Sequence, residues 1–406
     1  MYVNQSSYKE PLWTRSFLLL IIGNLFIFMS FQMLIPTLPP YFKDMGASPL
    51  EVGLVTTLFS IGAIISRPYI GSMLAYKERK MLVVLGAVSL LLITLVYPVT
   101  SIIFFLLAMR FVHGIVWGVS TTVNGTAAVD IVPDSRLGEG MGYFGLSMTV
   151  GMIIAPSLGI FLYQNAPFPV MIAVSAGLGL LAIGFLSIVS YRTPDAVLKT
   201  KKEDVPFSFF ASLIEKAAWY PAFITLLATF GYGTVVTFII IFSEERGLDQ
   251  IFLFYLCNAI VATLIRPIAG KYFDRHGPKR IIIICSFLTF IAMWILSLAT
   301  SIVFVVISGI MFGAGFGSLI PTLQSWVLSE TPQHRRGAAN GMFYSAIDLG
   351  IGLSGLVFGI IAQFTETAHL FQLSSIFFLL AAVLTLAEAK LRKEKKQWSN
   401  AEALNR

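Results

Sequence analysis

Residues 266–280 read Arg-Pro-Ile-Ala-Gly-Lys-Tyr-Phe-Asp-Arg-His-Gly-Pro-Lys-Arg, a short basic segment with two glycines. The segment joins two long apolar stretches, 250–272 and 280–299. A helix needs about 20 apolar residues to cross the hydrocarbon core of a bilayer, and each stretch has about that length. Glycine allows the two helices to approach closely, and the cations suit the anionic surface of a membrane. The segment therefore predicts a tight turn between two membrane-spanning helices.

The composition of the whole chain agrees with this interpretation. Of the 406 residues, 56% are hydrophobic and 12% are charged, and the mean hydropathy is +0.82. Soluble domains are usually about 45–50% apolar and about 25% charged. So few charged residues leave too little polar surface to cover a globule, which excludes a soluble enzyme and a disordered chain. We expect a polytopic membrane protein.

Outward from the turn at 266–280, the chain divides into twelve apolar stretches. They are 17–39, 51–74, 81–99, 101–123, 141–163, 168–190, 219–242, 250–272, 280–299, 301–327, 339–362 and 368–389. The longest break, 191–218, is polar and charged. The sequence thus predicts an all-α protein with an N-terminal six-helix bundle over 1–190, a cytoplasmic linker over 191–218, and a C-terminal six-helix bundle with a basic cytoplasmic tail over 219–406.

An internal repeat supports the division into halves. A shift of 199 residues takes Arg67-Pro68 to Arg266-Pro267 and Gly71 to Gly270. The same shift also relates Gly114 to Gly313, Gly118 to Gly317, Gly142 to Gly341 and Gly151 to Gly350. Two six-span repeats of this kind place a substrate site at their interface, near the midplane of the bilayer.

The cations are distributed unevenly among the loops. The chain has 28 Lys and Arg residues and a formal net charge of +7. Most of these cations lie in the two terminal tails, the central loop and every second short loop. Only Lys43 and Arg246 fall in the remaining loops. Because basic loops face the cytoplasm, we expect both termini there and expect no nucleic-acid partner. The first apolar stretch is too long for a signal-peptide core and ends in Pro-Thr-Leu-Pro, so no cleavable signal is predicted.

The turn at 270–280 resembles the loop motif of the major facilitator superfamily, G-x-x-x-D-R-x-G-x-[KR]-[KR]. The matching residues are Gly270, Asp274, Arg275, Gly277 and Arg280. The resemblance extends over nearly the whole chain. It implies a transporter built from two six-helix halves.

The equivalent turn in the first half departs from the motif. It keeps Gly71, Arg79 and Lys80 but has Ala75 at the acidic position. Asp130 occupies the position where members of the superfamily supply a partner for the loop arginine. We expect an Arg79–Asp130 pair to latch this turn. The alternative is a solvated Asp at a helix end.

The fifth stretch carries small residues at regular intervals, namely Gly142, Gly151, Ala155, Pro156 and Gly159. Their spacing gives close helix packing and a bend at the proline. The pattern is similar to the antiporter signature of the 12-helix drug:proton antiporter (efflux) group of bacteria, with Ala155 in place of one glycine. That resemblance implies export, whereas the packing alone does not indicate a direction.

Two ionisable residues lie deep in apolar stretches. Arg110 and Asp348 are each nine residues from the start of a stretch, about 13–14 Å inside at 1.5 Å per residue. Such residues are rare in membranes and suggest function. We expect Asp348 to bind the coupling proton and Arg110 to approach it across the cavity, with His113 as a relay. The alternatives are a permanent ion pair, a helix-capping role for Asp348, and a neutral His113 bonded to a neighbouring helix.

Several polar and aromatic residues are candidates for the lining of the substrate cavity. They are Asn24, Gln32, Trp117, Asn124, Tyr232, Gln324 and Tyr344. Hydrogen bonds between helices are the alternative role for each. The first stretch offers only Asn24 and Gln32, although many drug:proton antiporters carry an acid there, so coupling through the first half is not expected.

No metal-ligand spacing, phosphate-binding loop or nucleophile–base arrangement occurs, so no metal, cofactor or enzymatic activity is predicted. We expect a monomeric, proton-coupled secondary transporter in a bacterial cell membrane that exports a small amphipathic or zwitterionic solute, such as a drug, metabolite or metallophore. Its expected partners are that solute, protons and membrane lipids. Proton-coupled uptake, sugar efflux and lipid flipping on the same fold remain as alternatives.

Overall fold

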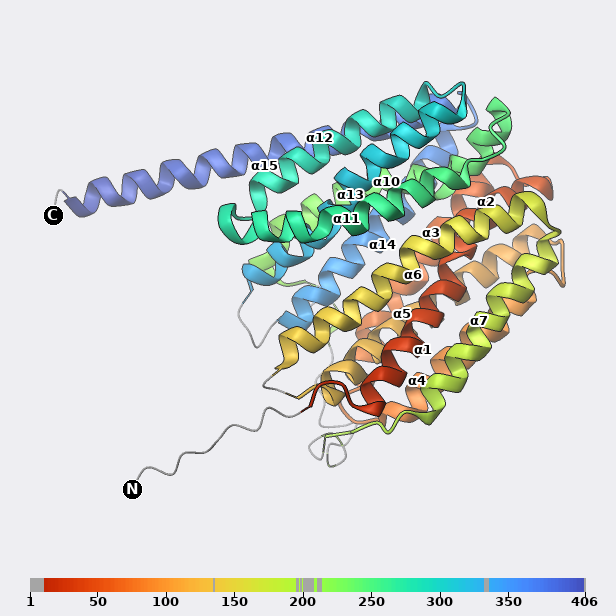
Figure 1. Ribbon diagram of the computed structural model, residues 1–406, viewed down its shortest axis with the longest axis horizontal. Helices are drawn as coiled ribbons and strands as arrows, with labels where there is room; N and C mark the ends of the chain where they lie inside the picture. The colour runs from red at the N-terminus through yellow and green to blue at the C-terminus, as the bar shows by residue number, and fades with distance from the viewer. Residues whose placement is uncertain are drawn as a thin grey trace.

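The protein is a bundle of long helices (Figure 1). The computed structural model describes residues 11–133, 136–194, 197, 199, 208–209, 214–331 and 336–404, and at some helical positions it describes only the backbone. Within these ranges no residue is in a β-strand. The predicted all-α polytopic fold is therefore confirmed.

The described residues of the first half form seven helices, two of which share one span. They are α1 (Arg15–Gln32), α2 (Leu34–Asp44), α3 (Pro49–Met73), α4 (Arg79–Val96), α5 (Ile103–Ile131), α6 (Leu137–Asn165) and α7 (Phe168–Ile188). The second half follows the 3-10 turn Lys216–Ala218. Its helices are α10 (Trp219–Arg246), α11 (Phe252–His276), α12 (Pro278–Ser297), α13 (Ile302–Ser329), α14 (Arg336–Ile361) and α15 (Thr367–Leu404).

Each of the twelve predicted stretches corresponds to one helical span, counting α1 and α2 as one span, and their ends differ by a few residues. By length and composition, 11 helical segments of the described residues are able to cross a membrane, and α11 contributes a shorter apolar segment, Phe252–Ile265. The protein is therefore a multi-pass membrane protein.

Local sequence signals explain several helix boundaries. Pro36 lacks the amide hydrogen that would bond to Gln32, and the chain changes from α1 to α2 at Met33. Ser48 and Glu51 form a reciprocal capping box at the start of α3, with Pro49 at the first helical position. Gly277 has a φ of 76° between α11 and α12, which is a conformation that glycine adopts without strain.

The helices form two groups that we call the first bundle (α1–α7) and the second bundle (α10–α15). Both termini lie toward one end of the molecule (Figure 1), which we call the proximal end. The opposite, distal end carries the turns 45–48 and 247–251. Between the bundles, α3 packs on α14, α6 on α11, and α2 on α10.

The contact between α3 and α14 is closest in its distal part. A Cβ atom added to Gly53 would lie 2.0 Å from the carbonyl oxygen of Gly355, so the two backbones touch there. Thr57 donates a hydrogen bond of 2.8 Å to the carbonyl of Gly352. Such contacts between small residues allow close packing of membrane helices. At the same end Lys43 Nζ lies 2.8 Å from a Glu244 carboxylate oxygen, which joins α2 to α10. The bundles are therefore held together at the distal end.

Helix α10 occupies the interior of the protein. Of its most apolar window, 89% is buried by other parts of the protein, whereas the other spans have 39–56% buried. It packs against α14 and α15 of its own bundle and against α2 of the other. The seventh span is thus surrounded by protein rather than by lipid.

Candidate functional site

An ion pair joins the two bundles on the proximal side of the closest contact between α3 and α14. Arg67 Nη2 lies 2.6 Å from Asp348 Oδ2, and Arg67 Nε donates to the same oxygen at 3.2 Å. The two side chains are 10% and 11% exposed. Because Arg67 belongs to α3 and Asp348 to α14, relative movement of the bundles changes this pair directly.

Neutral polar groups extend this pair into a network on four helices. The Arg67 guanidinium lies 5.6 Å from the ring centroid of Tyr344 on α14, and its Nη1 lies 3.4 Å from Thr121 Oγ1 on α5. Gln324 on α13 donates to Asn340 Oδ1 at 2.9 Å and to Tyr344 Oη at 3.5 Å. We call Arg67, Thr121, Gln324, Asn340, Tyr344 and Asp348 the central polar network.

The network contains three of the predicted site residues, Asp348, Gln324 and Tyr344, but the cation differs from the predicted one. Arg110 does not bond to Asp348 in this structure. Its Nε donates to the carbonyl of Val55 at 2.9 Å, and its guanidinium lies 4.6 Å from the ring centroid of Phe59. Both of these contacts are to α3, so this arginine stabilises the packing within the first bundle.

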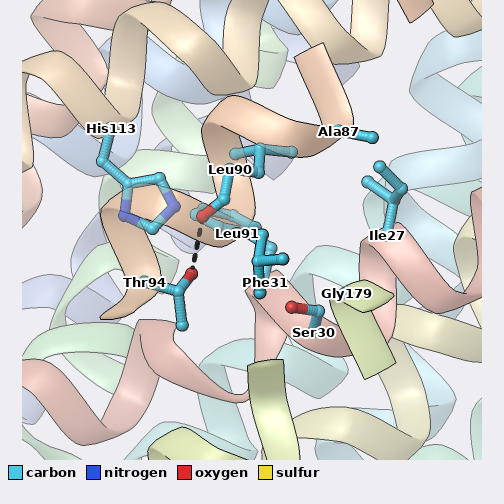
Figure 2. Close-up of a pocket in the computed structure, with 9 residues that line it drawn as sticks. All are labelled: Ile27, Ser30, Phe31, Ala87, Leu90, Leu91, Thr94, His113 and Gly179. Carbon is cyan, nitrogen blue, oxygen red and sulfur yellow. Dashed lines mark hydrogen bonds between the residues drawn. The ribbon is translucent and has the colours of Figure 1, made fainter. Parts of the chain in front are cut away.

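His113 also lies inside the first bundle. Its Nδ1 is 2.9 Å from Tyr97 Oη at the end of α4, which corresponds to the alternative of a histidine bonded to a neighbouring helix. Its Nε2 has no hydrogen-bond partner among the described residues. A small pocket lined by α1, α4, α5 and α7 lies beside the imidazole (Figure 2), and about 10 Å³ of it is available to the centre of a water molecule. That is about the space that one water molecule requires.

Two predicted cavity residues form hydrogen bonds between helices instead. Asn24 donates to Ser147 Oγ at 3.2 Å, and Asn124 donates to Asn24 Oδ1 at 3.3 Å. These bonds join α1, α5 and α6 within the first bundle. Both residues therefore have the alternative role stated above, which is a hydrogen bond between helices.

The other three predicted cavity residues lie on α1, α5 and α10. Gln32 is buried on α1. Trp117 on α5 stacks on Phe31 at a centroid distance of 3.8 Å, and Tyr232 on α10 stacks on Phe316 at 4.4 Å. The structure does not bring these residues into the central polar network.

The turn between α3 and α4 contains the predicted pair. Arg79 Nε lies 2.6 Å from Asp130 Oδ2, and the Arg79 side chain is 5% exposed. The same guanidinium also bonds to the carbonyls of Leu74 and Lys77. Gly71, in the last turn of α3, and Lys80, in the first turn of α4, are exposed. The pair thus fastens the turn to the proximal end of α5.

The turn between α11 and α12 uses a different ion pair. Lys279 bonds to Glu388 on α15, with side chains 22% and 14% exposed. Arg275 and Arg280 are exposed, and Gly277 makes the turn. Gly270 and Asp274 lie in α11 at positions outside those whose side chains the structure describes.

The small residues of α6 pack against the first span. A Cβ atom on Gly159 would lie 2.6 Å from the carbonyl oxygen of Met33, and one on Gly151 would lie 2.7 Å from Phe28 Cβ. Ala155 and Pro156 are buried, whereas Gly142 lies outside the positions described beyond the backbone. The close packing that the spacing predicts is present at the break between α1 and α2.

Three residues of the central polar network, Arg67, Thr121 and Asn340, were not among the predicted site residues. The signal of Arg67 was the Arg-Pro pair that recurs at Arg266-Pro267, which indicated the repeat but no chemical role. Asn340 and Thr121 had no distinguishing pattern, since amides and hydroxyls are common in membrane helices.

Comparison with known proteins defines the class. The family model of the Major Facilitator Superfamily matches residues 20–354 and 253–404. The chain is 24% identical to the staphylopine export protein of Staphylococcus aureus over 86% of this chain and 89% of that protein. It is 23% identical to the quinolone resistance protein NorA of the same species over 92% of this chain and 97% of that protein. The chain belongs to the major facilitator superfamily and is a membrane transporter, not an enzyme.

The solved structures agree on the fold. The crystal structure of the nucleoside transporter NupG has a TM-score of 0.70 to this chain at 16% identity, covering 92% of this chain and 99% of that one. At this level of identity the similarity concerns the arrangement of the helices alone.

Proposed function

We propose that the protein is a proton-coupled exporter of a small amphipathic or zwitterionic organic solute that works by alternating access. Two relatives are named for export or drug resistance, which favours efflux. Because basic loops usually face the cytoplasm, we place the proximal end and both termini in the cytoplasm of a bacterial cell and the distal end outside. The structure then corresponds to a state closed on the outside. The working unit is one chain in the lipid bilayer.

The observation that carries the proposal is the ion pair between Arg67 and Asp348. It is the described charge pair that connects α3 to α14, and it lies where the closed part of their contact ends. When the distal ends separate, Arg67 and Asp348 move apart. A carboxylate without a cation in a low-dielectric site is neutralised by binding a proton, which arrives from outside. When the bundles close again, Arg67 returns, displaces the proton and releases it to the cytoplasm.

The two proximal turns are proposed to guide this movement. Arg79 and Asp130 hold the first turn on α5, while Lys279 and Glu388 hold the second turn on α15. Each ion pair lies within one bundle, the first pair in the first bundle and the second pair in the second. They therefore keep each bundle rigid while the Arg67–Asp348 pair opens and closes.

Vesicle transport with Asp348→Asn tests the proton-coupling role. The probe is a labelled solute, chosen from a panel of drugs and amino-acid conjugates, that the wild-type protein exchanges across the membrane. We expect Asp348→Asn to retain exchange of solute for solute and to lose transport driven by a pH gradient. Glu366→Gln is the matched control, because Glu366 is an exposed acid at the distal end. Normal pH-driven transport by Asp348→Asn would refute the coupling role.

A further inference from the structure

Resting on the proposed function, we propose that the Arg67–Asp348 pair is a docking site for a zwitterion, which inserts between the two bundles with its ammonium group on Asp348 and its carboxylate on Arg67. A zwitterion is one class among the amphipathic and zwitterionic solutes considered above.

The charges of the pair are balanced by each other. Among the described residues, the ionisable groups that face Asp348 are Arg67 from α3 and the phenol of Tyr344 from α14 itself. The other helices packed against α14 are α10 and α13. At this level they contribute Thr229 and Gln324, which do not titrate in the accessible pH range. A solute that displaces one member of the pair therefore leaves the other without a counter-charge.

This arrangement discriminates by the number and sign of the charges on the solute. A monocation that binds Asp348 displaces Arg67 and leaves an unpaired guanidinium inside the membrane. A monoanion that binds Arg67 leaves an unpaired carboxylate there. Removing one partner of a buried pair is strongly unfavourable, because the remaining charge stays desolvated. A zwitterion replaces both partners at once, so that neither protein charge is left unpaired.

The surroundings of the pair suit such a solute. The two side chains retain 10% and 11% exposure, so that the pair is reachable before the bundles separate further. Gln324, Asn340 and Thr121 supply neutral donors and acceptors, and the Tyr344 ring lies 5.6 Å from the guanidinium. Arginine also binds carboxylates with two parallel hydrogen bonds. The site therefore fits a compact body with one ammonium and one carboxylate group.

Binding of three matched probe series to the purified protein in lipid nanodiscs tests the inference. The zwitterions are phenylalanine and homologues with more methylene groups between the charges. The cations are phenethylamine and its homologues, and the anions are 3-phenylpropionate and its homologues. All three classes keep their charges between about pH 6 and pH 7, so changes in affinity report on the protein.

For the wild-type protein near neutral pH, we expect at least one zwitterion to bind roughly tenfold more tightly than the matched amine and acid. Arg67→Gln should shift the preference to the amine, because Asp348 is then free. Asp348→Asn should shift it to the acid, because Arg67 is then free. Lys43→Gln removes an exposed pair between the same two bundles and should leave the order of affinities unchanged.

The double variant Arg67→Gln/Asp348→Asn keeps the inference testable if the single variants unfold, because it retains a neutral pair of nearly the same shape. It should bind the three classes without preference. A wild-type protein that binds no zwitterion more tightly than the amine and the acid would overturn the inference, as would a double variant that keeps the preference.

Acidification of the wild-type protein provides an independent test of the inference. Protonation of Asp348 frees Arg67, so the affinity for the acid should rise as the pH falls, and this rise should be absent in Asp348→Asn. Failure of these binding results would overturn zwitterion docking even if pH-driven transport is lost in Asp348→Asn. Intact pH-driven transport in Asp348→Asn would overturn only the coupling role, so the two failures are distinguishable.

Discussion

Two of the interfaces between the bundles, α3–α14 and α6–α11, are related by the internal repeat, but their sequences differ in charge. A shift of 199 residues relates Arg67 on α3 to Arg266 on α11, and Asp348 on α14 to Thr149 on α6. The α3–α14 interface is joined by the Arg67–Asp348 ion pair. The repeat keeps the arginine but has no second acid at the position equivalent to Asp348. The acid that pairs with Arg67 is therefore specific to one half of the repeat.

Making the two interfaces alike should have the largest effect. Asp348→Thr copies the residue at the equivalent sequence position of α6 and leaves Arg67 unpaired. We expect a loss of about 3–5 kcal/mol in the free energy of unfolding, the cost of breaking a buried pair from one side. Thermal unfolding in detergent measures it. Adding Arg67→Gln to Asp348→Thr should recover most of the loss. If Asp348→Thr alone is as stable as the wild type, the Arg67–Asp348 pair does not contribute to the free energy of unfolding.

The close backbone contact of α3 and α14 gives the next largest effect. Gly53→Val places a side chain where Cβ itself would meet the Gly355 carbonyl oxygen at 2.0 Å. Overpacking of this kind costs about 1–3 kcal/mol, and it should also prevent distal closure and slow transport. The matched control is Gly184→Ala, because a Cβ at Gly184 has no neighbour within 4 Å. Equal transport rates for the two variants would contradict the role of this contact.

The two proximal turns allow a finer comparison. Asp130→Asn weakens a buried pair whose arginine is 5% exposed, and Glu388→Gln weakens a pair whose lysine is 22% exposed. A hydrogen bond to a charged group contributes about 1.5–3 kcal/mol, and the value falls with exposure. We expect Asp130→Asn to lower the unfolding temperature more than Glu388→Gln does. The reverse order would mean that the second turn is the stronger latch.

The exposed distal pair should have the smallest effect. Lys43 and Glu244 are 38% and 39% exposed, so Lys43→Gln should change stability by less than about 1 kcal/mol. The small difference should vanish when salt screens the charges. A larger effect, or one that persists at high salt, would make this pair a second determinant of closure.

Hydrophobic length, composition and the repeat were sufficient to predict the fold, because each of these signals depends on the bilayer rather than on detailed packing. Asp348 was also predictable, since an acid in an apolar stretch is rare. The Arg79–Asp130 contact followed from the resemblance to the superfamily, whose members supply a partner for the loop arginine at the position of Asp130. Each of these features can be recognised in the sequence without knowledge of how the helices pack.

The partner of Asp348 was not predictable from the same signals. Arg110 and Asp348 have equal depths in their stretches, but depth does not say which face of a helix a residue occupies. Arg110 faces α3 within its own bundle, whereas Arg67, near the end of its stretch, has a side chain long enough to reach α14. The amides Asn24 and Asn124 illustrate the same limit, because a polar group that lines a cavity and one that joins two helices look alike in sequence.

The enclosed position of α10 has a consequence for biosynthesis. This helix leaves the ribosome before α14 and α15, which pack against it, have been made. Three of its hydroxyl groups need no later helix, because Thr225, Thr229 and Thr234 each bond to a carbonyl of the same helix. A bond of this kind satisfies a hydroxyl group in lipid, so these three residues allow α10 to enter the bilayer before the helices that enclose it are made.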